Sequence, residues 1–356
     1  MMRVRRIFAV ILVVGISLPS VSWGQDIREV LKKMQDSTTA PEYQGMLTTV
    51  FINTPFTQVY RYKIVNYGNS LRKEELLTDG PNKEVSFDDG TNLWRFFPYQ
   101  NLLIKEKSRM IREGGCGIEN ELDLLKKSYR IQMVGEYLVN ERKGYRISFK
   151  PKQADRPEQV YWIDAETGIP FKIEKYGPDN ALVSVSSFTQ IDFRPSRRGS
   201  NPFLMVPPNT SLTEVKEESN LTFEKAKGIM GTRIIHPGYI PPGFLLRDII
   251  LRMSGEKKDL QLFYTDGLSS LSVFQSPSGG EDSKPIAHTE KIKLKAGEAY
   301  LNVSGTLNML KIRSTAVSTT LVGEVFKNEI IKVGESLTQV DNEKSQPRRG
   351  SPLSAP

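Results

Sequence analysis

The chain has 356 residues, a formal net charge of +8 at pH 7 and a single cysteine, Cys116. One cysteine excludes an intramolecular disulfide and a zinc site built from several cysteines, so the fold must rely on apolar cores. The chain is long enough to form two such cores. The positive charge is moderate and spread out, which suits an acidic partner or anionic lipid head groups, and no basic–aromatic motif points to nucleic acid.

The first 24 residues have the pattern of a secretory signal. Three arginines precede an apolar stretch over residues 7–18, which is shorter than the ~20 residues that a membrane-spanning helix needs. Small residues, Ser22 and Gly24, stand at the −3 and −1 positions, so we predict cleavage after Gly24; an uncleaved anchor is the alternative. Loss of these arginines lowers the net charge to +5. The mature chain has no other apolar segment long enough to span a membrane, and we expect it in a bacterial periplasm.

Most of the first half of the mature chain has the pattern of antiparallel strands. Apolar and polar residues alternate with a period of two between turns rich in Gly, Pro, Asn and Asp. Helices are predicted over 26–34 and 118–127, and strands over 43–52, 58–65, 71–77, 83–87, 92–97, 102–106, 129–134, 145–150, 159–163, 169–176 and 182–193. A sheet of this length must cover its apolar face, so we expect a long meander that is curled or plugged by the two helices.

The most regular part of this pattern is a hairpin over residues 159–176. Tyr161 and Ile163 point to one face of the first strand, and Ile169, Phe171 and Ile173 share one face of the second. Pro170 has no N–H to donate, so its position must lie at an edge or a bulge.

Prolines concentrated over residues 194–211 predict a linker between a first domain, 25–193, and a second domain, 212–338. In the second domain, helices are predicted over 223–230 and 325–337, and strands over 233–235, 245–253, 260–265, 269–275, 292–295, 299–303, 309–313 and 319–322. The polar segment 339–356 is predicted to be a disordered tail.

No catalytic or metal-binding pattern is found. The two histidines, His236 in a proline-rich turn and His288 in a polar loop, form no metal-binding motif, and no nucleophile elbow, P-loop or dinucleotide fingerprint occurs. Cys116 lies in a glycine-rich loop as an incidental residue or, alternatively, as a reactive thiol. We therefore expect a binding protein without a cofactor rather than an enzyme.

The remaining candidate site is apolar. Residues that we expect to face the interior of the curled sheet are Phe51, Trp94, Phe96, Leu103, Tyr161, Ile163, Phe171 and Ile173. They are either ordinary core or the lining of a groove that takes an acyl chain, because each buried methylene contributes about 0.8 kcal/mol.

Three stretches resemble the periplasmic sigma-E regulators of the RseB/MucB family. They are V-Y-W-I-D-A-E-T-G-I-P-F-K-I-E-K-Y from residue 160, Y-I-P-P-G-F from 239 leading to L-F-Y-T-D-G-L-S-S-L-S-V-F from 262, and T-L-V-G-E-V-F-K-N-E-I-I-K-V-G-E-S-L from 320. The Y-T-D-G-L-S-S-L-S-V-F part, which begins at residue 264, is the most specific. By itself, the N-terminal meander would indicate no more than a similarity to the lipoprotein carriers LolA and LolB.

This resemblance implies an α+β fold with an unclosed antiparallel β-barrel that is plugged by helices, followed by a smaller α/β domain. It implies a protein that binds the periplasmic part of an anti-sigma factor, shields it from proteolysis and releases it when lipid or mislocalised lipoprotein accumulates. Within the most specific motif, Tyr264, Asp266 and Gly267 are candidate partner-binding residues; a structural turn is the alternative for Asp266 and Gly267. The alternative function is a carrier or chaperone for lipid or acylated lipoprotein without a signalling partner.

Overall fold

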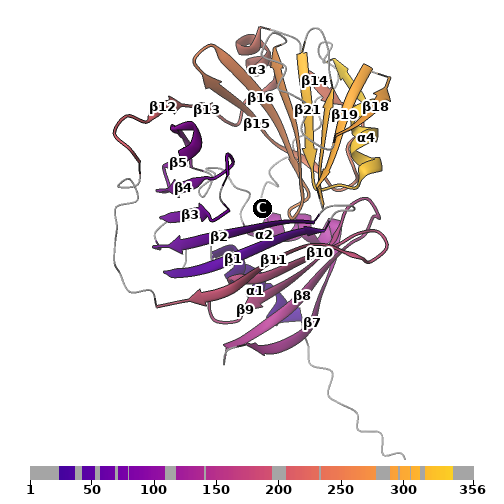
Figure 1. Cartoon of the computed structure of the whole chain (residues 1–356). Coiled ribbons are helices and arrows are strands. Elements are labelled where there is room, and N and C mark those ends of the chain that lie inside the picture. Colours follow the sequence, from indigo (N-terminus) through magenta and orange to yellow (C-terminus); the bar gives the residue numbers. More distant parts are fainter. Residues whose placement is uncertain are drawn as a thin grey trace, which may run out of the picture.

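The structure is a computed structural model that describes residues 24–36, 42–52, 57–68, 71–78, 80–108, 118–139, 142–194, 206–231, 234–277, 289–295, 297–304, 306–312 and 317–339. These residues form two large β-sheets, a small two-stranded sheet and four α-helices. In Figure 1 the first sheet lies below the second. The apolar stretch of the predicted signal, Cys116, His288 and the predicted tail beyond Gln339 lie outside the described residues.

The first sheet has 12 strands in the order β12-β6-β5-β4-β3-β2-β1-β11-β10-β9-β8-β7. Its strands are β1 (Tyr43–Ile52), β2 (Thr57–Asn66), β3 (Arg72–Leu76), β4 (Val85–Asp88), β5 (Asn92–Phe97), β6 (Leu102–Lys107), β7 (Tyr129–Val139), β8 (Arg142–Pro151), β9 (Glu158–Asp164), β10 (Pro170–Tyr176), β11 (Leu182–Asp192) and β12 (Ser211–Glu214). Every neighbouring pair is antiparallel except β12 and β6. The end strands β12 and β7 do not pair with each other, so the sheet is unclosed.

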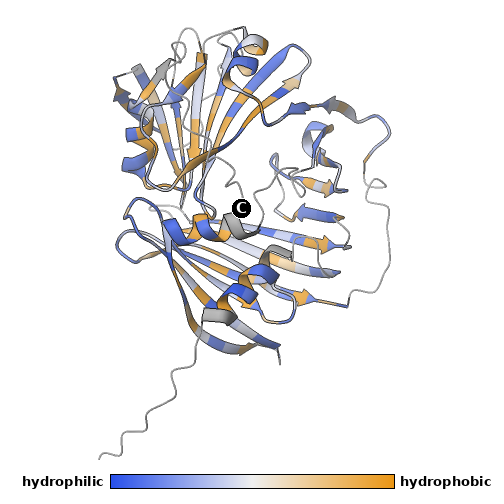
Figure 2. Cartoon of the chain, turned by 180° about the vertical axis from the view of Figure 1, so that it is seen from behind, coloured by the Kyte–Doolittle hydropathy of each residue, from blue (hydrophilic) through white to orange (hydrophobic). Residues whose placement is uncertain are grey.

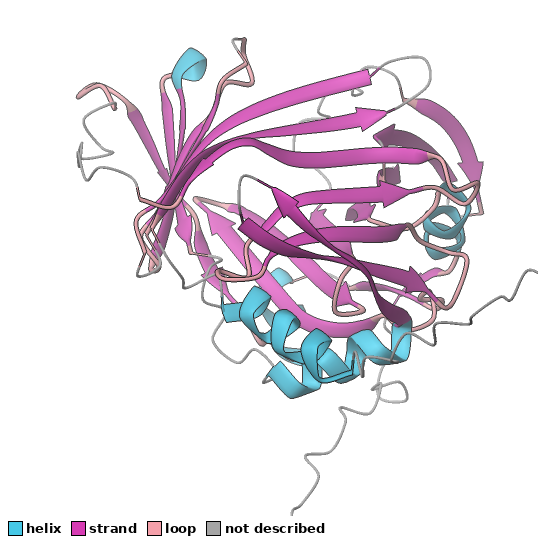
Figure 3. Ribbon diagram, turned by 90° about the horizontal axis from the view of Figure 1, so that it is seen from below, coloured by secondary structure: helices cyan, strands magenta, loops and turns pink. Residues whose placement is uncertain are grey.

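Helices α1 (Gly24–Asp36) and α2 (Ile118–Ser128) lie against one face of β7, β8 and β9, which is called the inner face below (Figure 3). They bury an apolar stripe against the sheet, as an amphipathic helix does. The buried members of this cluster are Val30, Leu31, Leu122, Leu125, Tyr129, Ile147, Phe149 and Ile163. Plugging of a barrel interior by these helices stays a prediction.

The hairpin between β9 and β10 has the bulge that its proline requires. The register shifts between Pro170 and Lys172, so the missing N–H of the proline falls at an irregular position in the ladder. At the turn, Gly168 has a φ of 74°, and a Cβ there would come within 2.4 Å of the Lys33 backbone. Glycine is therefore needed for the close approach of α1 to this turn.

The second sheet has eight strands in the order β13-β15-β16-β17-β21-β20-β19-β18. They are β13 (Lys216–Glu218), β15 (Leu245–Ser254), β16 (Lys257–Thr265), β17 (Ser270–Pro277), β18 (Glu290–Leu294), β19 (Gly297–Ser304), β20 (Leu307–Ile312) and β21 (Val317–Gly323). Helices α3 (Phe223–Met230) and α4 (Lys327–Glu335) pack with it around a second apolar cluster that includes Leu251, Leu262, Leu310 and Ile330. A separate pair joins β14 (Ile235–Pro237) to β22 (Leu337–Gln339).

The predicted helix over 325–337 is too long. Helix α4 ends at Glu335, and the next residues form β22 because they pair with β14, about a hundred residues earlier in the chain. A local pattern cannot show such a partner.

The two sheets are joined by a short continuous run of chain. Strand β12 is paired with β6 of the first sheet, and after Val215 the chain enters β13 of the second sheet. The second sheet therefore begins at Lys216, whereas the predicted start of the second domain is residue 212. The predicted domain limits stay a prediction.

Candidate functional site: the domain junction

A tight turn between β16 and β17 carries Asp266 into the space between the two sheets. Its Oδ1 accepts the backbone N–H groups of Leu268, at 2.9 Å, and Ser269, at 2.7 Å, which is the usual way in which Asp stabilises its own turn. Gly267 has a φ of 95°, so the turn needs a residue that tolerates left-handed backbone. The Asp266 side chain is fully buried.

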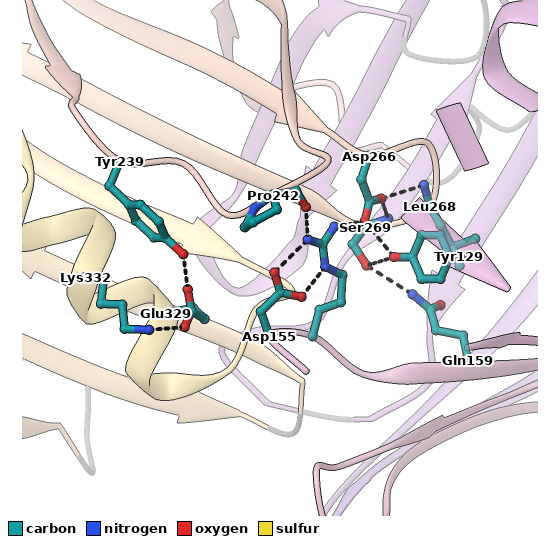
Figure 4. Close-up of polar contacts among 11 residues, drawn as sticks. Tyr129, Asp155, Gln159, Tyr239, Pro242, Asp266, Leu268, Ser269, Glu329 and Lys332 are labelled. Atoms are coloured by element: carbon teal, nitrogen blue, oxygen red, sulfur yellow. Dashed lines mark hydrogen bonds and ion pairs between the residues drawn. The ribbon is translucent and has the colours of Figure 1, made fainter. Parts of the chain in front are cut away.

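Arg156, from the loop between β8 and β9, meets this carboxylate across the junction (Figure 4). Its Nη1 donates to Oδ2 of Asp266, and its Nη2 donates to the carbonyl oxygen of Pro242. Within the first domain, its Nε and Nη2 bind the two oxygens of Asp155, at 2.6 and 2.8 Å. The guanidinium also lies 4.4 Å from the ring centroid of Phe244. Only 2% of the Arg156 side chain is exposed, so a single buried cation links two carboxylates from different domains.

Further hydrogen bonds surround this ion pair. Tyr129, at the start of β7, donates its hydroxyl to Oδ2 of Asp266 at 2.7 Å and lies 3.2 Å from the Ser269 hydroxyl. Gln159 Nε2 donates to the same hydroxyl, at 3.2 Å. The polar groups that enter the junction are thus largely satisfied, as buried polar groups must be.

The electrostatics of the site follow from this burial. Burial raises the pKa of Tyr129 strongly, and the negative charge of Asp266 raises it further, so Tyr129 stays a hydrogen-bond donor. Burial alone would lower the pKa of Arg156, but its hydrogen bonds to Asp155 and the charges of both carboxylates outweigh burial and raise it. The junction therefore keeps its cation charged.

Glycines let the two domains approach closely. A Cβ on Gly243 would lie 2.6 Å from the Ser128 hydroxyl oxygen, and one on Gly267 would lie 3.2 Å from the side chain of Leu125. Leu268 packs into the cluster that contains α1 and α2. The second domain is thus seated on the C-terminal end of α2.

A second row of contacts extends the junction toward α4. The N–H of Phe326 donates to the carbonyl oxygen of Asp155 at 2.9 Å, and Lys175 forms an ion pair with Glu324. Beside them, Tyr239 donates to Glu329 at 2.7 Å, and Lys332 binds the other oxygen of that carboxylate at 2.6 Å. Burial, followed by the hydrogen bond to Glu329, raises the pKa of Tyr239 to about 12.

Known proteins share this architecture. The family model of the MucB/RseB N-terminal domain matches residues 26–215, more than half of the chain. The chain belongs to the MucB/RseB family. The resemblance seen in the three sequence motifs is thereby confirmed.

Individual MucB/RseB-like structures share the fold over both domains. A chain in the structure of the Pseudomonas aeruginosa MucA/MucB complex has a TM-score of 0.55 and 16% identity, covering 89% of this chain and 100% of its own. MucB in complex with MucA(peri) gives a TM-score of 0.54 and 16% identity, with coverages of 88% and 99%.

A similar sequence is the uncharacterized protein MJ0687 of Methanocaldococcus jannaschii, which is 22% identical over 351 residues, 94% of this chain and 98% of that protein.

Two of the motifs that carry the MucB/RseB resemblance form the second-domain side of the junction. The Y-I-P-P-G-F stretch supplies Pro242, Gly243 and Phe244, and the Y-T-D-G-L-S-S stretch supplies Asp266 to Ser269. Tyr264 is buried in the core of the second domain, with 7% exposed. Asp266 and Gly267 face the first domain and shape the turn. Partner binding by these three residues stays a prediction.

The register of the first sheet divides the apolar candidates between two faces. Tyr161 pairs with Ile173, and the pairing continues through Ser186 to Thr49, which places Ile163 and Phe51 on the same, inner face. The same tracing through β2, β3, β4 and β5 places Arg95 on the inner face.

The expectation that all eight apolar candidates face the interior of the curled sheet is therefore wrong. Trp94 and Phe96 flank Arg95 on β5 and so point to the opposite face, as does Leu103, which pairs with Phe96. Phe171 also leaves the set, because the bulge turns its ring toward Tyr137, 5.2 Å away, and Tyr137 contacts Trp162 on the opposite face.

The inner face changes character away from the helices. Over β3 to β5 it carries ion pairs, with Arg72 2.6 Å from Glu74 and Arg95 2.7 Å from Glu84. Figure 2 shows strands of mixed hydropathy at this end of the sheet, away from the helices. Between this charged part and the helix-covered part, the inner face of β1, β2 and β11 carries a further apolar cluster, in which Tyr43 and Ile64 are buried and Phe188 packs against them.

Sequence reasoning missed Arg156, Asp155 and Tyr129. Arg156 lies in a polar loop, K-Q-A-D-R-P, where an arginine ordinarily faces solvent, and no local periodicity marks it as buried. Within the described part of the chain, no group of three or more His, Cys, Asp or Glu residues could hold a metal. No helix there is both long and apolar enough to cross a membrane.

Proposed function

We propose that the mature chain is a periplasmic regulatory protein that binds the periplasmic part of an anti-sigma factor and shields it from proteolysis. The observation that carries this proposal is membership of the MucB/RseB family together with a fold shared, over both domains, with MucB in complex with MucA(peri). Secretion, cleavage after Gly24 and residence in the periplasm belong to the same proposal, since the partner would be reached only there.

The second domain supports a regulator over a simple carrier. Carriers that resemble the first domain lack a second domain, whereas here a second domain meets the first through the buried Arg156–Asp266 ion pair and through close contacts at α2. Buried polar contacts that are satisfied in this way fix how the two domains meet while the contacts are intact. A defined two-domain surface suits recognition of a folded or extended protein segment.

Lipid sensing is a second part of the proposal, and the inner face limits where it can occur. Phe51, Tyr161, Ile163 and Ile173 share that face, and Ile163 is fully buried in the cluster beneath the helices. Beneath the helices, an acyl chain would bind only by displacing α1 or α2, whereas the cluster around Tyr43 and Ile64 offers apolar surface outside the helix-covered cluster. The ion pairs over β3 to β5 do not suit an acyl chain, which cannot satisfy them. The alternative function, a lipid or lipoprotein carrier without a signalling partner, would use the same face.

A pull-down tests the proposal. The mature protein, residues 25–356, is immobilised and exposed to envelope extract of its own bacterium, and the bound species are identified by mass spectrometry. We expect a single-span membrane protein whose cytoplasmic part binds a sigma factor. Recovery of lipids or acylated lipoproteins alone would replace the regulatory function by the carrier function.

A further inference from the structure

The junction is built around one buried cation, which carboxylates of both domains contact. Arg156 and Asp155 come from the first domain, and Asp266 and the Pro242 carbonyl come from the second. The side chains of the ion triad are 2%, 8% and 0% exposed for Arg156, Asp155 and Asp266. Among the described residues, Lys175 and Glu324 form a further ion pair across the boundary, which is more exposed, at 18% and 22%.

Such a contact cannot be loosened gradually. If Asp266 moved away from Arg156 by a small distance, too small for water to enter, the carboxylate would stay buried without its charged partner. The glycine contacts at Ser128 and Leu125 leave no room for a sliding adjustment either. The favourable arrangements are therefore two: a closed one with the triad intact, and an open one in which water solvates both sides.

A separate connection would keep the domains together after opening. Strands β12 and β13 are one continuous segment, and the N–H of the intervening Val215 donates to the Lys105 carbonyl at 2.8 Å. This segment uses none of the residues of the ion triad. It pairs with β6, at the opposite end of the sheet order from β7 and β8. Figure 1 shows β12 and β13 far from β7 and β8.

We propose that the two domains exist in a closed and an open arrangement, and that the ion triad of Arg156, Asp155 and Asp266, called the latch below, holds the closed one. Opening of this latch regulates binding of the partner. Opening would uncover apolar surface that is now covered, including Leu125, Phe244 and Leu268. A ligand that favours the open form shifts the population away from the closed form. Only the regulatory consequence rests on the proposed function; the two states are a property of the chain alone.

The triad predicts an order among substitutions. Arg156→Met leaves Asp155 and Asp266 facing each other across the junction without a cation, so it should open the latch most. Asp266→Asn leaves Arg156 paired with Asp155, and Asp155→Asn leaves it paired with Asp266. Asp155→Asn therefore keeps the charged link between the domains, from Arg156 to Asp266, and should open the latch least.

One amide reports the state of the latch directly. The N–H of Phe326 donates to the Asp155 carbonyl across the domain boundary, whereas the amides of β16 and β17 belong to the interior of the second sheet. Hydrogen exchange of the full mature chain can therefore separate opening from unfolding. We expect Arg156→Met to accelerate exchange at Phe326 by about 10-fold or more while β16 and β17 keep their protection.

Arg142→Met is the matched control. Arg142 binds both oxygens of the buried Asp164 at 2.7 and 2.8 Å, but both residues lie in the first domain. It should leave exchange at Phe326 unchanged. The latch is refuted if Arg156→Met leaves Phe326 exchange at the wild-type rate, or if β16 and β17 lose protection in parallel with it, which would mark a purely structural role.

A second measurement covers the case in which Arg156→Met does not fold. Small-angle scattering of Asp266→Asn should then show a larger radius of gyration than Asp155→Asn, and equal radii would refute the latch. If the latch passes these tests but the chain captures no anti-sigma factor, the function is wrong and the hinge stands.

Discussion

Single residues at the junction combine charge, burial and backbone shape. Asp266 serves two purposes, since one oxygen closes its own turn and the other receives Arg156 and Tyr129. Gly267 follows it with a positive φ and faces Leu125. The turn is thus shaped by the neighbouring domain as well as by its own sequence.

Substitution of Gly267 by alanine should be costly. The left-handed backbone and the clash with Leu125 together should lower the free energy of unfolding by about 2–4 kcal/mol. Gly255→Ala is the control, because Gly255 also has a positive φ, 59°, but a Cβ there meets nothing within 4 Å. It should cost only about 1 kcal/mol. Urea denaturation measures both, and equal losses would show that Gly267 makes no close interdomain approach.

A pH effect at residue scale follows from Glu329. Burial would raise its pKa, but hydrogen bonds from Lys332 and Tyr239 outweigh burial and hold it below its ordinary value of 4.5. A lowered pKa in the folded state means a contribution to stability that is present above about pH 4.5 and is lost as the pH falls through the folded-state pKa.

Glu329→Gln tests this sign. The difference in unfolding free energy between wild type and variant should be largest near about pH 7 and should shrink toward about pH 3. Urea titrations across that range give the difference. If this difference in unfolding free energy grows as the pH falls, Lys332 and Tyr239 do not stabilise the ionised carboxylate.

At the scale of elements, the strength of the sequence pattern decided what could be predicted. Strands β1 and β5 and helix α3 have the predicted limits, because each combines a clear period with turn or cap residues; Thr222 caps α3 by accepting the Lys225 N–H at 3.2 Å. Strands β12, β13 and β22 were missed, because each is short and is defined by a partner distant in sequence.

The candidate site shows the same limit more sharply. The D-G turn and the P-P-G-F stretch stood out as motifs, but nothing in the sequence showed that they face Arg156. The apolar set failed for a related reason, since alternation assigns faces within one strand and only the register relates faces between strands. Trp94 and Phe51 each fit a half-buried strand, yet the ladder places them on opposite sides.

Helix α1 offers a prediction at this scale. Leu31 is 3% exposed within the helix–sheet cluster, so Leu31→Ala should lower the free energy of unfolding by about 2–5 kcal/mol. Lys32→Ala, one residue along on the exposed side, should change it by less than about 0.5 kcal/mol. Thermal and urea unfolding compare the two variants. Similar small changes would show that α1 does not cover the sheet in solution.

The whole molecule is two sheets with separate cores, joined by a strand segment and by a buried ion triad. The separate cores let each domain keep its structure while the relation between the domains changes. Under the proposed function, this division would let a ligand on one domain act on partner binding through the junction.

The most direct test of the regulatory account is a protease-protection assay. The periplasmic part of the anti-sigma factor recovered with the mature chain is digested by a periplasmic protease with and without that chain, and the cleavage rate is followed by gel or mass spectrometry. The account predicts that the wild-type chain slows cleavage at stoichiometric concentration and that Arg156→Met protects less. Cleavage at the same rate with and without the wild-type chain would contradict it.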